Sequence, residues 1–237
     1  MSSGIYVATA GAVAQSNALD ATANNIANAS TAGFHGDRVT FREALSAARS
    51  PDVATVGAGT ARIDNQPGAL LPTENPFDLV FDGDGYFAVI TSNGPRYTRA
   101  GNFQLDQARN LVTSDGFAVR GEGGAPINVP PDAGLISIGA DGSVSADDNP
   151  IGKLELARFA PAQMKREGGS LFSATGRPLI GDPPKVRSGM LESSNVNIVR
   201  GVVDLVKVSR TYEALMRMIQ GYHDIESRAA RELGAPK

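Results

Sequence analysis

Residues 197–222 read NIVRGVVDLVKVSRTYEALMRMIQGY, and apolar or aromatic side chains recur in this stretch at every seventh position. The repeat consists of Ile198, Leu205, Tyr212 and Ile219, accompanied by Val208, Leu215 and Tyr222 at a spacing of three. Such spacing places the side chains in one stripe along an α-helix. The pattern predicts a long C-terminal helix with one apolar face, and Ser193, Ser194 and Asn195 are candidates for its N-cap.

The N-terminal end of the chain carries a similar pattern. The repeat here is Ile5, Ala12, Leu19 and Ile26, with Ala8 three positions after the first member. It predicts a helix from Ser3 to about Ala32, ended by Gly33 in the left-handed conformation, with Phe34 folding back onto the last turn. Neither helix has a second helix next to it in the sequence. The two ends are therefore expected to bury their apolar faces against each other or against neighbouring copies.

Between Pro76 and Ser188 the sequence changes to short runs of β-branched and aromatic residues, most of them closed by a turn signal. The expected strands cover residues 77–81, 86–90, 97–105, 111–113, 117–119, 127–129, 136–138 and 154–159. The turn signals are Asp82-Gly83, Asn93-Gly94, Asp115-Gly116 and Asp141-Gly142. Asn-Gly and Asp-Gly dipeptides are typical of antiparallel hairpins, so a compact antiparallel β domain is expected.

Together these patterns predict an α+β fold. Long N- and C-terminal helices pair as a coiled-coil-like α domain, and an antiparallel β-rich domain is inserted between them. The expected parts are an N-terminal helix over residues 1–34, an irregular or extended connector over 35–75, the β-rich domain over 76–188 and a C-terminal helix over 189–237.

Composition limits the chemistry that the chain can perform. The 237 residues include 22 basic and 25 acidic side chains scattered along the chain, so a nucleic-acid partner is not expected. Cysteine is absent, which excludes disulfides, thiolate catalysis and cysteine-ligated metals. No stretch reaches the roughly 20 apolar residues that span a bilayer, and the start lacks the pattern of a cleavable signal peptide. Membrane insertion is therefore not expected.

Three stretches resemble the bacterial flagellar rod and hook proteins. They are ANNIANASTAGF at Ala23–Phe34, SGMLESSNVNIVRGVVDLVKVSRTYEALMRMIQ at Ser188–Gln220, and the β-type run from Asp78 to Gly121. They occur in the order that the family has, so chance is a poor explanation of the resemblance. Within that family, the short length and the lack of a long insertion between Phe34 and Pro67 favour a proximal rod protein over a distal rod or hook protein.

The resemblance implies a structural subunit of the proximal rod, which polymerises through its terminal helices into a torque-transmitting shaft around the export channel. The implied partners are copies of itself, other rod proteins of the proximal FlgB and FlgC type and the distal FlgG type, and the flagellar type III export apparatus. The implied location is the rod within the periplasm, reached without a cleavable signal. No cofactor and no enzymatic activity are implied.

Two other functions are open. One is a distal-rod or hook-family subunit. The other, more distant, is a glycan-binding or peptidoglycan-acting β module, because paired carboxylates in a β domain can hydrolyse glycosides. The sequence has no Ser-His-Asp order, phosphate-binding loop or zinc-ligand spacing to support an enzyme.

The expected assembly interface combines the apolar stripes with polar residues near the helix ends. Asn24, Asn25 and Asn28 lie in a predicted helix, where asparagine is unfavourable. They suggest a polar ladder that sets the register between subunits, and the alternative is a solvent-facing or capping set. The full set is Ile5, Ala8, Ala12, Leu19, Asn24, Asn25, Ile26, Asn28, Gly33, Phe34, Asn195, Asn197, Ile198, Leu205, Val208, Tyr212, Leu215, Ile219 and Tyr222.

Two acidic clusters have ordinary explanations. They are Asp82 with Asp84, and Asp141 with Asp147 and Asp148. Neither has the ligand spacing of an EF-hand loop, so both are expected in hairpin turns rather than in a calcium site.

The two histidines and Arg99 also have ordinary explanations. His35 and His223 lie at opposite ends of the chain without a metal-binding partner, so a packing or solvent-facing role is expected. Arg99, close to Tyr97, has the chemistry to bind a carboxylate. A solvated strand face that carries both Arg96 and Arg99 is the preferred interpretation.

Overall fold

The computed structural model describes residues 3–39, 61–181 and 183–234, so the central part of the expected connector lies outside the described residues. The chain divides into two units. The helical unit contains α1 (Ser3–Ala27), β1 (Asp37–Val39), β2 (Ala61–Ile63) and α3 (Ile198–Gly234). The β-rich unit contains Asn28–His35 and Asn65–Val196.

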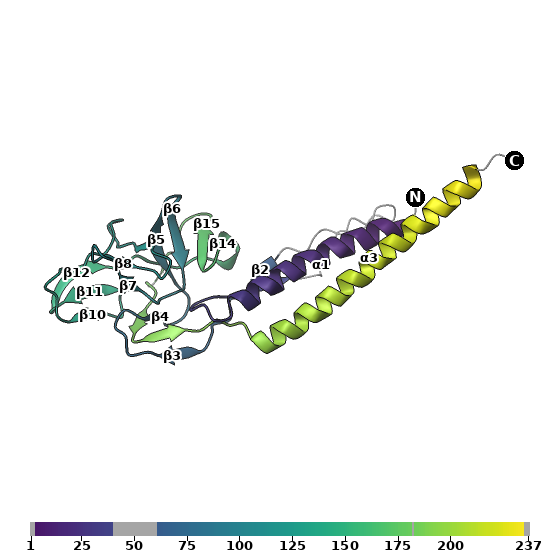
Figure 1. The fold of residues 1–237 in the computed structure, drawn as a ribbon. Coiled ribbons are helices and arrows are strands. Elements are labelled where there is room, and N and C mark those ends of the chain that lie inside the picture. The colour runs from purple at the N-terminus through teal and green to yellow at the C-terminus, as the bar shows by residue number, and fades with distance from the viewer. Residues whose placement is uncertain (1–2, 40–60, 182, 235–237) are drawn as a thin grey trace. The chain divides into compact units, whose positions relative to one another are not determined.

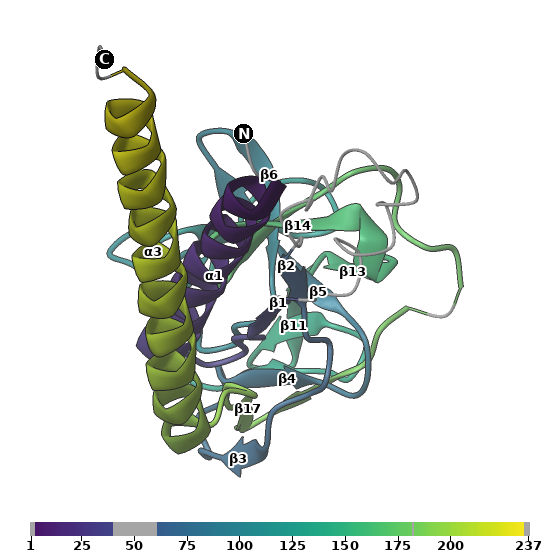
Figure 2. The same cartoon turned by 90° about the vertical axis from the view of Figure 1, so that its right-hand side faces the viewer.

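In the helical unit, α1 and α3 run side by side in opposite directions (Figures 1 and 2). The small side chains of Ala8 and Ala12 are buried, which allows α3 to approach closely. The β1 and β2 strands form an antiparallel pair, with Asp37 opposite Ile63, and contact α1. This arrangement confirms the predicted pairing of the terminal helices.

The end of α1 differs from the prediction. The helix ends at Ala27 rather than near Ala32, because the chain turns at Asn28, whose carbonyl accepts a hydrogen bond of 3.1 Å from the Thr31 N–H. Gly33 adopts a positive φ of 63°, but it lies beyond this turn and does not end the helix. Phe34 is fully buried within the β-rich unit, so the predicted fold-back onto the helix is wrong.

The start of α3 also differs from the prediction. The helix begins at Ile198, and the Oδ1 atom of Asn197 accepts a hydrogen bond of 3.0 Å from the Arg200 N–H. Asn197 is therefore the N-cap, in place of the three candidates over residues 193–195. Neither α1 nor α3 has the sustained apolar length that a bilayer crossing requires, and no other helix of the described segments supplies it.

The β-rich unit consists of short antiparallel strands. They are β3 (Leu70–Pro72), β4 (Leu79–Phe81), β5 (Tyr86–Thr91), β6 (Gly94–Thr98), β7 (Gln104–Leu105), β8 (Leu111–Val112), β9 (Ala118–Val119), β10 (Ile136–Ile138), β11 (Ser143–Ala146), β12 (Asn149–Lys153), β13 (Leu156–Ala157), β14 (Met164–Gly168), β15 (Leu171–Ala174), β16 (Val186–Ser188) and β17 (Met190–Glu192). A short 3-10 turn, η1 (Pro161–Gln163), precedes β14.

The largest sheet has the order β14-β15-β6-β5-β9-β8-β7, with β13 also paired to β5. Residues 86–89 of β5 are buried on both faces of the strand, which places β5 at the centre of the unit. Phe87 is the hub of the core: its ring lies 4.3 Å from that of Phe81 and 5.0 Å from that of Phe103, measured between centroids. A three-stranded sheet, β10-β11-β12, and the pairs β16-β4 and β17-β3 complete the unit.

Three of the predicted hairpins are confirmed. Asn93, Asp115-Gly116 and Asp141-Gly142 lie in the turns of β5-β6, β8-β9 and β10-β11. Asp82-Gly83 is different, because it connects β4 to β5 and these strands belong to different sheets.

Two predicted strands are wrong. The run over residues 97–105 is split into β6 and β7, because Gly101 lies so close to the Leu79 backbone that a Cβ would stand 1.8 Å from the Leu79 carbonyl oxygen. Residues 127–129 form no strand: they have one isolated bridge, between Asn128 and Asn110, although Ile127 belongs to the core.

The β3 strand lies at an exposed edge. Within the described part of the chain it pairs only with β17, and both Leu70 and Leu71 are exposed. The Thr73 N–H donates to the Gly189 carbonyl, and the Ala69 carbonyl accepts from the Ser193 N–H. Backbone N–H and C=O groups of successive residues in a strand point alternately toward the partner strand and away from it. Those of Leu70 and the C=O of Pro72 therefore point away from β17.

Candidate assembly interface

The contact between α1 and α3 has a single register. A Cβ placed on Gly11 would stand 3.4 Å from Cδ1 of Leu215, and one placed on Gly201 would stand 2.9 Å from Cγ1 of Ile26. Residues later in α1 contact residues earlier in α3, so the two helices are antiparallel. The apolar stripes predicted from the sequence therefore face each other.

Most of the predicted apolar residues lie on the paired faces of the two helices. We call them the inner stripe: Ile5, Ala8, Ala12, Leu19 and Ile26 on α1, and Leu205, Val208, Tyr212, Leu215, Ile219 and Tyr222 on α3. All of them are buried or half-buried. Ile198 is the exception, because 49% of its surface is exposed.

A second apolar face of α3 was missed by the sequence analysis. We call it the outer stripe, and it consists of Val199, Val202, Val203 and Val206, which are 46–75% exposed. At 100° per residue these valines lie on the side of α3 opposite the inner stripe. The spacing of three, four and seven residues was present in the sequence. It was overlooked because the heptad repeat accounted for the helix.

The asparagines in the last turn of α1 and just after it make contacts within the chain. The Nδ2 atom of Asn25 donates to the Asp37 carbonyl at 2.8 Å, and its Oδ1 accepts from the Asp37 N–H at 2.7 Å. The Asn25 side chain thus makes with the backbone of β1 the pair of hydrogen bonds that a neighbouring strand would make. Asn28 accepts a bond of 3.3 Å from the Thr31 hydroxyl, and Asn24 is half-buried.

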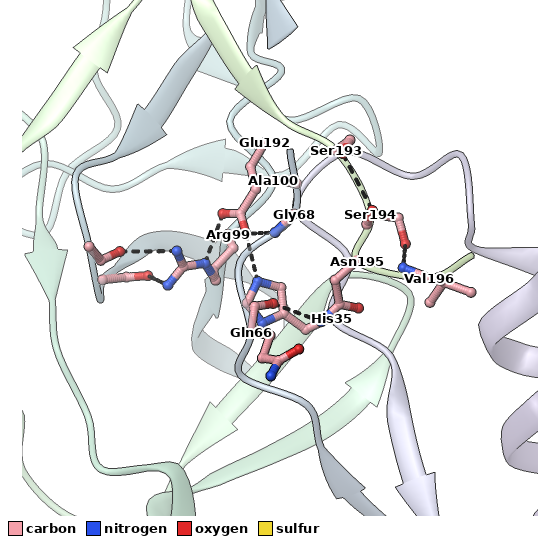
Figure 3. Close-up of polar contacts among 12 residues, drawn as sticks. His35, Gln66, Gly68, Arg99, Ala100, Glu192, Ser193, Ser194, Asn195 and Val196 are labelled. Atoms are coloured by element: carbon pink, nitrogen blue, oxygen red, sulfur yellow. Dashed lines mark hydrogen bonds and ion pairs between the residues drawn. The ribbon is translucent and has the colours of Figure 1, made fainter. Parts of the chain in front are cut away.

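A second candidate group lies in the β-rich unit and centres on Glu192, which is only 3% exposed (Figure 3). Its Oε1 lies 2.8 Å from Nε2 of His35 and accepts a bond of 3.0 Å from the Gly68 N–H. Its Oε2 accepts a bond of 3.1 Å from Nε of Arg99. We call these four residues the Glu192 cluster.

Arg99 overturns the preferred interpretation from the sequence. It is buried rather than solvated, and its remaining guanidinium nitrogens donate to the carbonyls of Gly83 and Gly85 at 3.0 and 3.3 Å. The guanidinium also lies 5.9 Å from the ring centroid of Tyr86. The carboxylate that Arg99 binds is that of Glu192 within the same unit, so the contact is an internal ion pair.

The electrostatics of the cluster favour an ionised carboxylate. Burial alone would raise the pKa of the Glu192 carboxyl, but the hydrogen bond from His35, the charge of Arg99 and the Gly68 N–H outweigh it and hold the pKa below its usual value. Because Glu192 can only accept, Nε2 of His35 carries the proton. Nδ1 of His35 is buried and has no hydrogen-bond partner among the described residues. Burial raises the pKa of the neighbouring Tyr86 phenol.

The same region joins the segment after α1 to the segment before α3. The Gly33 N–H donates to the Glu192 carbonyl at 2.7 Å, and the Asn195 N–H donates to the Phe34 carbonyl at 3.2 Å. The Arg166 guanidinium lies 4.5 Å from the Phe34 ring centroid. The predicted residues Gly33, Phe34 and Asn195 therefore hold the two ends of the β-rich unit together.

The acidic clusters belong to turns. Asp141 accepts bonds from the N–H and hydroxyl of Ser143, between β10 and β11, and Asp147 accepts from the backbone of Gly134 and Leu135. Among the described residues, no group of three acidic or histidine side chains is placed to hold a metal ion. His223 is exposed on α3.

Comparison with known proteins agrees with this layout. Residues 5–35 match the profile of the flagella basal body rod protein, residues 80–146 that of the flagellar hook protein FlgE/F/G D1 domain, and residues 187–232 that of the flagellar basal body rod FlgEFG protein C-terminal region.

Similar proteins align over nearly their whole length. The basal-body rod protein FlgF of Rhizobium meliloti is 34% identical over 94% of this chain and 96% of its own length. FlgF of Escherichia coli is 36% identical over 97% of both chains. FlgG of Agrobacterium fabrum is 33% identical over 97% of this chain and 98% of its own.

Proposed function

This chain belongs to the family of flagellar basal-body rod proteins, and we propose that it polymerises through its paired terminal helices into the proximal segment of the rod. It is a structural subunit of the basal body rather than an enzyme. The observation that carries the proposed interface is the outer stripe: α3 has one apolar face against α1 and a second apolar face exposed on its opposite side.

Exposed apolar helix faces are a sign of an interaction surface, because soluble monomers seldom expose contiguous apolar patches. Burying the four valines of the outer stripe against another subunit would contribute on the order of 1 kcal/mol for each side chain. The expected partners are copies of this chain and other rod proteins, of the proximal FlgB and FlgC type and the distal FlgG type.

The FlgF type is the preferred assignment within the family. Identity is 36% to the E. coli FlgF and 34% to the R. meliloti FlgF, against 33% to the A. fabrum FlgG and 35%, over 85% of this chain, to the FlgG of Bacillus subtilis. The chain is also short between Phe34 and Pro67, where distal rod and hook proteins are expected to carry an insertion. A distal-rod or hook position is the alternative outcome of the localisation test below.

The proposed location is the periplasmic part of the basal body, within a shaft that surrounds the export channel and transmits torque. Family membership supports export by the flagellar type III apparatus. On this proposal the terminal helices form the inner wall and the β-rich unit lies outside it.

The deciding experiment is complementation of a strain that lacks this protein. We expect the unmodified chain with a tag in the β-rich unit to restore motility, with tag density at the proximal end of the rod in isolated basal bodies. Replacing Val199 and Val203 with serine should abolish motility and rod incorporation, while the purified variant keeps the helical circular dichroism of the parent.

The matched control is Arg210→Ser, which changes a charged residue further along the same face of α3. We expect this variant to remain motile. Normal rods built from the Val199/Val203 double variant would disprove the proposed interface, and tag density at the distal end or on the hook would disprove the proximal assignment.

A further inference from the structure

Three glycines lie at the contact between α1 and α3, each opposite a large side chain of the other helix. A Cβ on the glycine would stand 2.7 Å from Oη of Tyr222 at Gly4, 3.4 Å from Cδ1 of Leu215 at Gly11, and 2.9 Å from Cγ1 of Ile26 at Gly201. In all three contacts the two residue numbers add to 226 or 227. One antiparallel register therefore holds from one end of the pair to the other.

The apolar stripes alone do not select this register. Both repeat every seven residues, so sliding one helix by seven residues, about 10.5 Å, again places stripe against stripe. After such a slip in one direction, Leu19 would face Gly201. After a slip in the other direction, Ile26 would face Val208. Apolar burial remains available in each case, so something other than hydrophobicity must distinguish the registers.

We infer that Gly4 and Gly201 determine the register of the α1–α3 pair. Contacts under 3 Å mean that a larger residue needs movement of the opposing side chain. That movement is easier at Gly4, where the nearest atom is the terminal hydroxyl of Tyr222, than at Gly201, where it is Cγ1 of Ile26. In the observed register the γ-branch of Ile26 occupies the space above Gly201, and the Tyr222 hydroxyl occupies the space above Gly4. A slip that sets Ile26 against Val208 would empty the space above Gly201 and press Ile26 onto a residue that carries a Cβ, while Tyr222 would move to Gly11. The opposite slip would place Leu19 over Gly201 and would carry Ile26 and Tyr222 beyond the ends of the opposing helices.

The register itself can be tested on the monomer, and only its consequence for assembly rests on the proposed function. If the chain polymerises through this pair, the register of the pair determines which residues of the inner stripe and the outer stripe lie at the same height along the shaft. A slipped subunit would present the outer stripe about 10.5 Å from its proper position.

Alanine at these glycines has two opposing effects, which a matched control separates. Alanine favours a helix over glycine at any interior position, but at Gly201 and Gly4 it also collides with the partner helix. Gly221 lies in α3, and a Cβ added there would meet nothing within 4 Å. Gly221→Ala thus gives the gain in helix propensity without the collision.

The register can be read by disulfide cross-linking, because the chain has no cysteine of its own. One reporter carries Gln15→Cys with Tyr212→Cys, which the observed register places opposite each other. The other carries Gln15→Cys with Ile219→Cys, which only a seven-residue slip brings together. Each pair is introduced into the parent, the Gly4→Ala/Gly201→Ala variant and the Gly221→Ala control, and oxidised as dilute monomer.

In the parent and in the Gly221→Ala control, we expect the in-register pair to cross-link and the displaced pair to remain reduced. In the Gly4→Ala/Gly201→Ala variant, the ratio of in-register to displaced product should fall about tenfold, the change that a penalty of about 1.4 kcal/mol produces. Adding Ile26→Ala to that variant removes the colliding side chain at Gly201 and should restore part of the ratio.

Equal yields from the two reporters in the parent, or the same ratio in the double-glycine variant and the Gly221→Ala control, would overturn the inference. Because these measurements use purified monomer, they do not depend on whether the chain is incorporated into a rod. If the parent gives the expected cross-link ratio but is not incorporated into a rod, that result would instead count against the proposed function.

Discussion

The Nε2 atom of His35 lies 2.8 Å from Oε1 of Glu192, although 157 residues separate the two in the sequence. Both side chains are buried. The contact joins the segment that follows α1 to the segment that precedes α3, and Arg99 supplies the compensating charge at 3.1 Å. The stability of the β-rich unit and the placement of its two ends therefore depend on the same carboxylate.

Glu192→Gln tests this dependence. The amide cannot compensate the buried charge of Arg99, and removing one partner of a buried ion pair costs about 3–5 kcal/mol. We expect a loss of that size in the free energy of unfolding, measured by urea denaturation with circular dichroism. Glu167→Gln, which removes the partner of Arg96 at the surface, should leave the midpoint unchanged. Equal effects of the two substitutions would show that the Glu192 cluster is not a source of stability.

The pH dependence of stability should follow the lowered pKa of Glu192. A carboxyl whose pKa is lower in the folded than in the unfolded state contributes stability that is complete above its unfolded value, near 4.5, and is lost as the pH falls through the folded value. We expect the parent to lose more stability than Glu192→Gln between about pH 5 and the acid limit of folding, as read from urea midpoints at each pH. Parallel profiles for the two proteins would contradict the assignment.

Gly33→Ala should be among the most damaging single substitutions. Gly33 has φ +63°, and a Cβ there would stand 2.5 Å from backbone atoms of Arg99, which cannot move aside as a side chain could. We expect a loss of about 3 kcal/mol or more, or failure to fold, in the same urea measurement.

Gly116→Ala is the control for Gly33→Ala, since Gly116 has φ +84° but nothing within 4 Å of a Cβ. It should cost only the backbone strain, about 1–2 kcal/mol. If both alanine variants unfold at the same urea concentration, the close approach of Gly33 to Arg99 has no energetic weight.

Asn25→Ala should loosen β1 without unfolding α1. The substitution removes both hydrogen bonds to the Asp37 backbone, each of which is worth about 1 kcal/mol. We expect faster amide exchange at Asp37, measured by NMR or mass spectrometry. Asn17→Ala, at an exposed position of the same helix, should leave that exchange rate unchanged. An unaltered Asp37 rate in the Asn25 variant would refute the local role.

The terminal helices of the isolated monomer should exchange faster than the core of the β-rich unit. The inner stripe of α1 includes the small residues Ala8 and Ala12, and Leu19 and Leu215 are only half-buried in the pair, so little apolar area stabilises it. We expect amides near both leucines to exchange well before those of β5. Protection there equal to that of Phe87 would mean that the helix pair is already stable before assembly.

The parts of the fold that repeat along the sequence could be predicted, because periodicity reports directly which face of an element is buried. The inner stripe is an example, and so are the β5-β6 and β10-β11 hairpins, whose turn residues lie next to the strands they connect. Helix ends were predicted less well. Residues 28–34 leave α1 because Phe34 is buried elsewhere, and that tertiary contact has no signal in the local pattern.

The Glu192 cluster could not be derived from the sequence. The three side chains that meet in it come from segments 93 and 157 residues apart, and a glutamate, an arginine and a histidine each look like surface residues when met singly. Arg99 was expected in solvent because charged strand residues usually are. Its burial depends on two carbonyls and a carboxylate that only the folded chain brings together.

The position of Pro72 at the outer edge of β3 has a consequence for handling the free subunit in solution. An unpaired strand with exposed leucines invites another chain to add to the sheet and so begin aggregation. Pro72 has no N–H to offer on that side, which interrupts the ladder that an incoming strand would need. Pairing of a second chain with this edge is therefore disfavoured.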